Sequence, residues 1–175
     1  HGDGSNRIFW LPDFLDKKVS IEKGINPDLK EDAEEFKRLT IDENFKFDIV
    51  LSNPHFSIKY KTKNKEEKKK LEEYDIAYTD GRENSNKIKS SLKSNVLSIE
   101  RYKDLLKEHG KLITIIDESV LNADSESSYR NFIKEHFIIK AVISLPRNTF
   151  INAETGVKTS ILYLLKKEDK KEKQP

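Results

Sequence analysis

The sequence predicts an α/β fold, because short apolar runs typical of strands alternate with stretches that have the periodicity of amphipathic helices. This order and spacing favour a sheet built from strand–helix–strand units. The expected strands are residues 7–11, 47–53, 111–117, 138–146 and 158–167, and the expected helices are residues 28–39, 94–110 and 125–137.

The first half of the chain holds two strands and one helix. RIFWL at 7–11 is a short strand candidate that ends at a Pro-Asp turn. Residues 28–39 are predicted to form a helix with Asp28 as its cap. FDIVLSN at 47–53 is a nearly continuous apolar run, which is typical of a parallel strand buried on both faces.

The second half is more regular. Apolar residues at helical spacing predict the helix at 94–110, which Ser94 can cap and Gly110 can end. The strand at 158–167 alternates apolar and polar residues, and we expect it at an edge of the sheet.

The composition limits the class of protein. At 175 residues the chain can form one domain with a real core, although 37% of its residues are charged and 35% hydrophobic. It has no cysteine and no apolar run of membrane-spanning length, so we expect a cytoplasmic protein without disulfides or a membrane partner. The four histidines lack metal-ligand spacing, so no metal site is expected.

Two segments are expected to lie outside the packed core. Residues 57–95 are rich in lysine and predict a mobile insertion; the lysine run at 59–70 would either neutralise DNA phosphates or form a solvated loop. The charged tail at 168–175 is predicted to be disordered. The partial catalytic domain would then span residues 1–167.

A possible site follows the strand at 47–53, because ligands of open α/β sheets bind beyond the carboxyl ends of the strands. The next residues are Asn53, Pro54, His55 and Phe56. The Asn53 side chain and the Pro54 carbonyl are two hydrogen-bond acceptors, and proline fixes the direction of its own carbonyl. Two such acceptors suit an amino group, and Phe56 offers a stacking face. The alternative is a plain Asn-Pro turn with Phe56 in the core.

This tetrapeptide resembles the (Asn/Asp/Ser)-Pro-Pro-(Tyr/Phe/Trp) motif of amino-group methyltransferases. From about residue 45 to 167 the chain is similar to the modification subunits of type I restriction–modification systems, which are DNA adenine-N6 methyltransferases. The segments that carry this similarity are VLSIERYKDLLKEHGKLITIIDESVLN, YRNFIKEHFIIKAVISLPRNTF and TGVKTSILYLLKK. The resemblance implies a Rossmann-like, S-adenosylmethionine-dependent fold. Release-factor glutamine methyltransferases carry a similar tetrapeptide and are a less favoured alternative.

The resemblance also implies roles for individual residues. Asn53 and Pro54 would accept hydrogen bonds from the adenine amino group, and Phe56 would stack on the flipped base. His55 departs from the family, which has proline there; it could contact the base or a phosphate, or be a plain loop residue. Asp13 would meet the adenine of S-adenosylmethionine, or would only form a turn.

One family feature has no counterpart in the sequence. Relatives hold S-adenosylmethionine with a loop similar to Asp-Pro-Ala-Cys-Gly-Ser-Gly-Gly, whereas HGDGSN at 1–6 resembles a connector further along. We therefore expect the C-terminal half of the sheet with the first strands missing and an inactive isolated chain. This chain would either self-associate through exposed strand edges or have its first forty residues displaced.

The implied partners are double-stranded DNA and separate specificity and restriction subunits. The remaining alternative is a non-catalytic DNA-binding or assembly module, which both His55 and the missing glycine-rich loop favour.

Overall fold

The computed structural model describes residues 8–22, 24–56, 58–79, 81–83, 85–147, 149–150 and 157–174. HGDGSN and the Thr-Gly of the TGVKTSIL segment lie outside these ranges. The chain divides into two compact units, His1–Lys46 and Phe47–Pro175.

The first unit is organised around helix α1 (Pro27–Lys37), which continues into a π-helical turn, η1 (Arg38–Asp42). Asn26 caps α1, since its side chain accepts a hydrogen bond from the Asp28 amide at 2.9 Å. The prediction that Asp28 is the cap is therefore wrong; Asp28 lies in the first turn, where its charge suits the helix dipole. Phe36 packs inward and meets the Phe9 ring at 5.7 Å.

The strand predicted at 7–11 does not form at residues 8–11. A strand needs a neighbouring strand for its backbone groups, and the described part of this unit offers none. The Trp10 amide instead donates to Asp32 Oδ2 at 2.9 Å, and the Trp10 side chain is 66% exposed.

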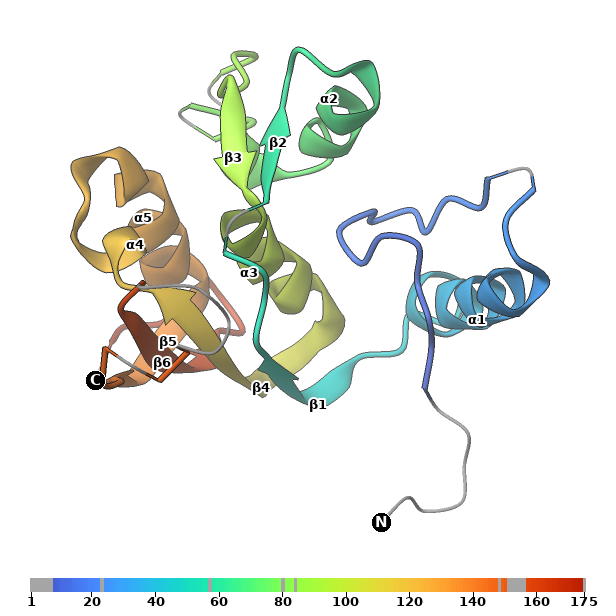
Figure 1. The fold of residues 1–175 in the computed structure, drawn as a ribbon. Coiled ribbons are helices and arrows are strands. Elements are labelled where there is room, and N and C mark those ends of the chain that lie inside the picture. Colours follow the sequence, from blue (N-terminus) through green and yellow to red (C-terminus); the bar gives the residue numbers. More distant parts are fainter. Residues whose placement is uncertain are drawn as a thin grey trace. The chain divides into compact units, whose positions relative to one another are not determined.

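The second unit contains a four-stranded mixed sheet with the order β1 (Phe47–Ser52), β4 (Leu106–Asp117), β6 (Thr159–Lys166) and β5 (Phe137–Ser144) (Figure 1). β1 and β4 are parallel, and β6 is antiparallel to both of its neighbours. The prediction that residues 158–167 form an edge strand is therefore wrong. Their alternating pattern reflects one covered face of the sheet, not a position at its edge.

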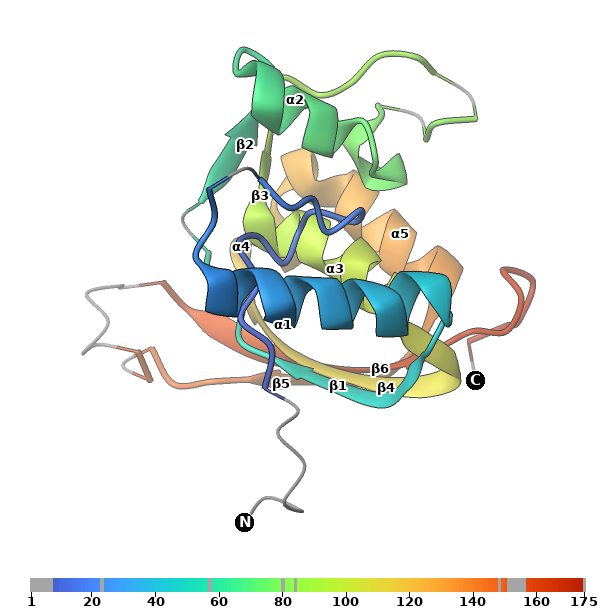
Figure 2. The same ribbon diagram turned by 90° about the vertical axis from the view of Figure 1, so that its right-hand side faces the viewer.

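Three helices lie on one face of this sheet: α3 (Ser94–Leu105), α4 (Ser119–Asn122) and α5 (Ser127–His136), which follows the short η3 (Asp124–Glu126) (Figure 2). They enclose an aliphatic and aromatic core. Its most buried members are Leu97, Ile99, Leu106, Leu112, Ile116, Val120, Tyr129, Phe137, Leu162 and Leu164.

The opposite face of the sheet is more open. Ile49 is 53% exposed and Leu51 is 71% exposed, so the prediction that the strand at 47–53 is buried on both faces is wrong. Ile113 and Ile143 on the neighbouring strands are also exposed.

Helix α3 ends at Leu105, five residues before the predicted Gly110. β4 then begins, and its register with β1 shifts between the Phe47–Leu106 and Ile49–Lys111 pairs. His109 has a φ of 57° within this irregularity. A Cβ on Gly110 would lie 2.8 Å from the Lys107 carbonyl oxygen, so glycine is required by a bulge, not by a helix end.

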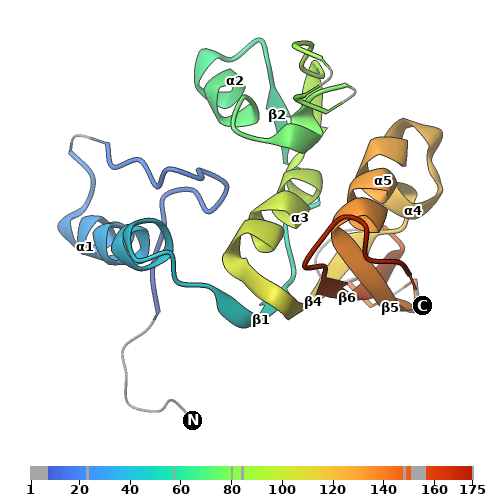
Figure 3. The ribbon, with the colours of Figure 1, turned by 180° about the vertical axis from the view of Figure 1, so that it is seen from behind.

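The lysine-rich insertion folds around a small sheet of its own. β2 (Lys59–Lys61) pairs antiparallel with β3 (Ser91–Lys93), and the chain that connects these strands forms α2 (Lys65–Leu71) and η2 (Asp75–Ala77) (Figure 3). The Glu100 carboxylate of α3 is 1% exposed and accepts hydrogen bonds from the Asp75 and Ile76 amides at 3.1 and 3.0 Å. These bonds connect the insertion to the main core, and its mobility stays a prediction.

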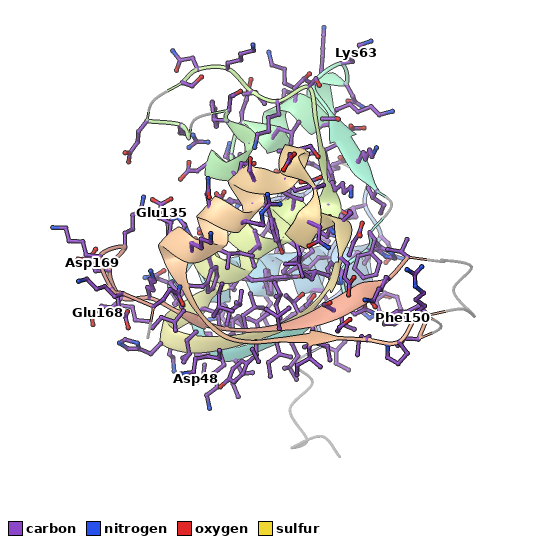
Figure 4. All side chains as sticks on the ribbon, turned by 90° about the vertical axis from the view of Figure 1, so that its left-hand side faces the viewer. Asp48, Lys63, Glu135, Phe150, Glu168 and Asp169 are labelled. Atoms are coloured by element: carbon purple, nitrogen blue, oxygen red, sulfur yellow. The ribbon has the colours of Figure 1, made fainter. Side chains whose placement is uncertain are left out.

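The C-terminal tail runs beside α5 and β5 in the described residues, up to residue 174 (Figure 4). Lys170 pairs with Glu135 at 2.5 Å, and the Gln174 side chain donates to the Phe137 carbonyl at 2.7 Å. The predicted disorder of this tail stays a prediction. Within the described ranges, no helix combines the length and apolarity needed to cross a membrane.

The end of α5 makes folding sensitive to pH through His136. Its ring is half-buried and lies 4.3 Å from the Phe132 ring. Burial, and next the nearby Lys103 ammonium, lower the pKa of His136 to about 4 from its ordinary value of 6.5. The unfolded chain therefore binds this proton more readily than the folded chain does.

We expect the free energy of unfolding to fall as the pH decreases from about 6.5 to about 4, and this loss to be smaller in His136→Gln. Urea unfolding of both proteins across this range is the measurement. Parallel curves for the two proteins would contradict the assignment.

Candidate functional site

The Asn53–Phe56 loop leaves the sheet at the carboxyl end of β1. Because β1 and β4 are parallel, their carboxyl ends lie at the same edge of the sheet, and Ser52 pairs with Thr114 as the last matched position. This is the edge at which open α/β sheets bind ligands. The tetrapeptide is therefore at the position that the sequence predicted for a site.

The side chains of the loop differ in exposure. Asn53 is exposed, and no hydrogen bond joins its amide to another described residue. Pro54 and Phe56 are half-buried, and His55 is exposed. The Phe56 ring is thus not enclosed in the core. The arrangement leaves the Asn53 acceptor and part of an aromatic ring accessible within four residues.

Helix α3 holds the loop at two points through one residue. The Ser94 hydroxyl donates to the His55 carbonyl at 2.6 Å, and the Ser94 amide donates to the Ile58 carbonyl at 2.9 Å. Lys93, not Ser94, occupies the N-cap position of α3, so the predicted capping role of Ser94 is wrong. Its hydroxyl is used to fix the loop instead, a contact between residues 39 positions apart.

The residue before the loop is also fixed. The Ser52 and Tyr102 hydroxyls form a hydrogen bond beneath the end of β1. Tyr102 is 3% exposed, and its burial raises its pKa, which keeps the phenol protonated at neutral pH. Asn53 therefore follows a strand end that is anchored from the helical layer.

A hollow of about 410 Å³ lies at this end of the sheet and includes Asn53 among its lining residues. Most of the others are aliphatic. They are Leu51, Ser52, Ile113, Thr114, Ile115 and Ile161. An apolar surface with an unpaired amide at one end suits a flat ring that carries a hydrogen-bond donor.

A charged cluster that the sequence analysis did not identify lies at the carboxyl end of β4. Asp117 is 9% exposed; it accepts a hydrogen bond from the Ser119 amide at 2.8 Å and pairs with Lys93 at 3.2 Å. Lys93 also lies 4.0 Å from Glu126. These contacts fix the segment that leads into α3. A signal for them was available, since Asp117 follows an apolar strand as Asn53 does.

The neighbouring Glu118 ties β4 to the two strands beyond it. Its Oε1 accepts hydrogen bonds from the Ser144 and Ser160 hydroxyls at 2.8 and 3.1 Å and lies 3.2 Å from Lys158 Nζ. These contacts, with the Ser144 bond first, lower the pKa of Glu118. Lys158, which the sequence placed in a strand, immediately precedes β6.

A buried amide lies next to Ser94. Asn95 is 3% exposed, and neither Oδ1 nor Nδ2 has a hydrogen-bond partner in the part of the chain that the structure describes. An unpaired buried polar group costs about 1–3 kcal/mol. Such groups are rare in native proteins outside functional sites, which marks this end of α3 as unusual.

Asp13 belongs to the first unit. Its Oδ1 accepts a hydrogen bond from the Leu15 amide at 2.8 Å, and its carbonyl accepts one from the Asp16 amide at 3.2 Å. These are the contacts of a turn-forming aspartate. A cofactor role for Asp13 stays a prediction.

A second hollow, of about 400 Å³, is formed by other elements, between η2, α5 and the tail. Its charged side chains are largely paired with one another: Arg82 with Asp75 at 3.4 Å, and Lys170 with Glu135 at 2.5 Å. This pairing leaves little charge to select a ligand. No group of three or more potential metal ligands occurs among the described residues.

Comparison with solved structures identifies the fold. A structure described as a class I S-adenosylmethionine-dependent methyltransferase from Listeria monocytogenes matches with a TM-score of 0.55 at 18% identity, over 85% of this chain and 43% of that one. The methyltransferase subunit of a type I restriction–modification system from Streptococcus thermophilus matches with a TM-score of 0.52 at 22% identity, over 81% and 31%. The fold is thus that of Rossmann-like methyltransferases.

A third structure, described as a type I modification subunit from Vibrio vulnificus, matches with a TM-score of 0.55 at 15% identity, over 75% of this chain and 26% of that one. The chain spans less than half the length of each of these three proteins. No curated protein sequence matches it significantly.

The sequence itself matches one family over most of its length. The family described as N-6 DNA Methylase aligns with residues 16–174, which include the Asn53–Phe56 loop and the whole four-stranded sheet. The chain therefore belongs to the N-6 DNA Methylase family.

Proposed function

We propose that this chain supplies the target-base side of an S-adenosylmethionine-dependent DNA adenine-N6 methyltransferase, the modification component of a restriction–modification system. One observation supports this most strongly. In a member of the N-6 DNA Methylase family, an asparagine amide without a hydrogen-bond partner among the described residues and a proline carbonyl follow a parallel strand at the ligand-binding edge of the sheet.

The chemistry needs positioning more than a strong base. Asn53 Oδ1 and the Pro54 carbonyl accept the two hydrogens of the adenine amino group, which directs the nitrogen lone pair away from the ring plane. S-adenosylmethionine, when bound, would supply the methyl group to this nitrogen, and the alkylated amino group would release one proton to solvent. Phe56 stacks on the extruded base, and stacking of about 1–3 kcal/mol offsets part of the flipping cost.

The methyl donor is held elsewhere in this proposal. The described residues contain no glycine-rich turn at the end of a strand, and Asp13 already forms a turn with Leu15. We therefore assign the target base to the Asn53–Phe56 loop, and the cofactor role of Asp13 stays a prediction. The segment that binds S-adenosylmethionine is expected in a further part of the protein or in a partner chain.

Ser94 offsets the loss of the second proline of the motif. Histidine at position 55 gives the loop one more free backbone angle than proline would. The hydrogen bond from Ser94 to the His55 carbonyl limits this freedom. The loop is thus held by a tertiary contact where relatives use a covalent ring.

The partners follow from this function. Double-stranded DNA is the substrate, and the resemblance to type I modification subunits adds specificity and restriction subunits. The second candidate is a non-catalytic DNA-binding or assembly module, which the histidine in the motif favours. A glutamine methyltransferase is less favoured, because the family match is to DNA enzymes.

The role of Ser94 predicts a change in loop dynamics. In Ser94→Ala we expect backbone amides of residues 55–58 to exchange with deuterium about fivefold faster, since a hydrogen bond contributes about 1 kcal/mol. Ser98→Ala is the matched control, because its hydroxyl contacts the Ser94 carbonyl and Tyr102, both in α3, and not the loop. Adding His55→Pro to Ser94→Ala should slow exchange again. Equal exchange in both serine variants would contradict the role.

The role of Asn53 predicts a loss of methylation. Asn53→Ala should lower adenine-N6 methylation about 100-fold or more, by analogy with removal of one preorganised polar group from an active site. Asn86→Ala, at an exposed position of the insertion, is the control.

The measurement is the N6-methyladenine content of DNA from the source cells, with each variant replacing the native gene copy. This setting keeps all natural partners present. Unchanged methylation in Asn53→Ala would favour the non-catalytic module instead.

A further inference from the structure

We propose that four lysines on the insertion bind the DNA backbone and hold the duplex beside the Asn53–Phe56 loop. This lysine row consists of Lys59, Lys61, Lys63 and Lys65. The inference rests on the proposed function, since it assigns to the same site the surface that meets its substrate.

The lysine row is a local concentration of charge. Residues 57–65 contain four lysines and no acidic residue, whereas the whole chain has a net charge of only +2. The electrostatic attraction of the protein for a polyanion is therefore not spread over its surface. It is concentrated on a segment that begins directly after Phe56.

The local fold directs the first two lysines outward. In the β2–β3 ribbon Tyr60 pairs with Leu92, which is 7% exposed, so this face of the ribbon is turned inward. Lys59 and Lys61 alternate with Tyr60 and are exposed on the other face. Successive lysines of a strand face are about 6.6 Å apart, which allows each to meet a different phosphate.

The other two lysines extend the row beyond the ribbon. Lys63 lies in the turn after β2, and Lys65 is the first residue of α2; both are exposed. Figure 4 shows Lys63 at the outer tip of the insertion, at the far end of the unit from Asp48.

The four ammonium groups form no ion pair with a described acidic residue, in contrast to their neighbours in α2. There Lys68 lies 3.7 Å from Glu72, and Lys69 lies 3.6 Å from Glu66. Glu67, close to the row, accepts hydrogen bonds from the Lys61 backbone amide at 2.5 Å and the Asn64 side chain at 3.1 Å. Its carboxylate is thus used to shape the turn.

The row is also fixed relative to the target-base loop. Ser94 binds the carbonyls of His55 and Ile58, and Lys59 follows directly. An open row of lysines is suited to evenly spaced phosphates, which ammonium groups contact without regard to sequence. A small anion would need an enclosed pocket, and base readout would need side chains held in fixed positions against the base edges.

The test is the salt dependence of binding between this chain and a fluorescent 20-base-pair duplex, measured by anisotropy without a methyl donor. The four-lysine variant K59Q/K61Q/K63Q/K65Q is compared with K68Q/K69Q/K171Q/K173Q, which loses the same charge elsewhere. We expect the slope of log K against log salt to decrease in magnitude by about 3.6 in the first variant and to change little in the second, because each of the four phosphate contacts contributes about 0.9.

An equal change of the slope in the two variants would overturn the proposal. Equal affinity of the chain for polyglutamate and for the duplex would also overturn it, because that result would indicate an acidic protein as the partner. Replacing the same four lysines by arginine keeps their charge and should retain the salt dependence of the native chain. This variant also shows that the four positions can be substituted without loss of folding. If the four-lysine variant keeps the salt dependence of the native chain while methylation still depends on Asn53, this inference is overturned and the proposed function is not.

Discussion

The parallel pairing of β1 with β4 is the constraint on which the rest of the site depends. Its register, with Ser52 opposite Thr114, places the end of β1 at the carboxyl edge of the sheet. A shift by one residue would exchange the two faces of β1 and move Asn53 from the site. The bulge around His109 and Gly110 sets this register, because it absorbs extra residues of β4 before regular pairing begins.

Hydrogen bonds from helix α3 fix the loop that follows β1. Tyr102 bonds to Ser52 at the end of the strand, and Ser94 bonds to His55 within the loop and to Ile58 just after it. Both residues belong to α3, so one rigid helix positions the strand end, the tetrapeptide and the start of the insertion. This explains how a motif with histidine in place of proline can keep a defined shape. It also connects the lysine row to the same support.

The sequence predicted most strands and helices of the second unit and the place of the Asn53–Phe56 loop, but not the elements of the insertion or the end of α3. The apolar run of β1 and the Asn-Pro that ends it predicted a strand followed by a loop at the carboxyl edge of the sheet, and the structure has this strand and loop; the ligand-binding role of the loop stays a prediction. The sequence was not sufficient for contacts between distant residues. Ser94 resembled a helix cap because capping is local, whereas its bond to His55 depends on how α3 packs. The inner position of β6 and the bulge at Gly110 likewise depend on pairing that local patterns do not encode.

The most direct test of this account is whether Asn53 detects the amino hydrogens of adenine. The measurement is the chemical shift of the Asn53 side-chain amide while this chain is titrated with a short single strand that contains one adenine. A second strand carries N6,N6-dimethyladenine, which has no hydrogen to donate. The account predicts a shift with the first strand that is lost with the second. Equal shifts with both strands, or none with either, would contradict it.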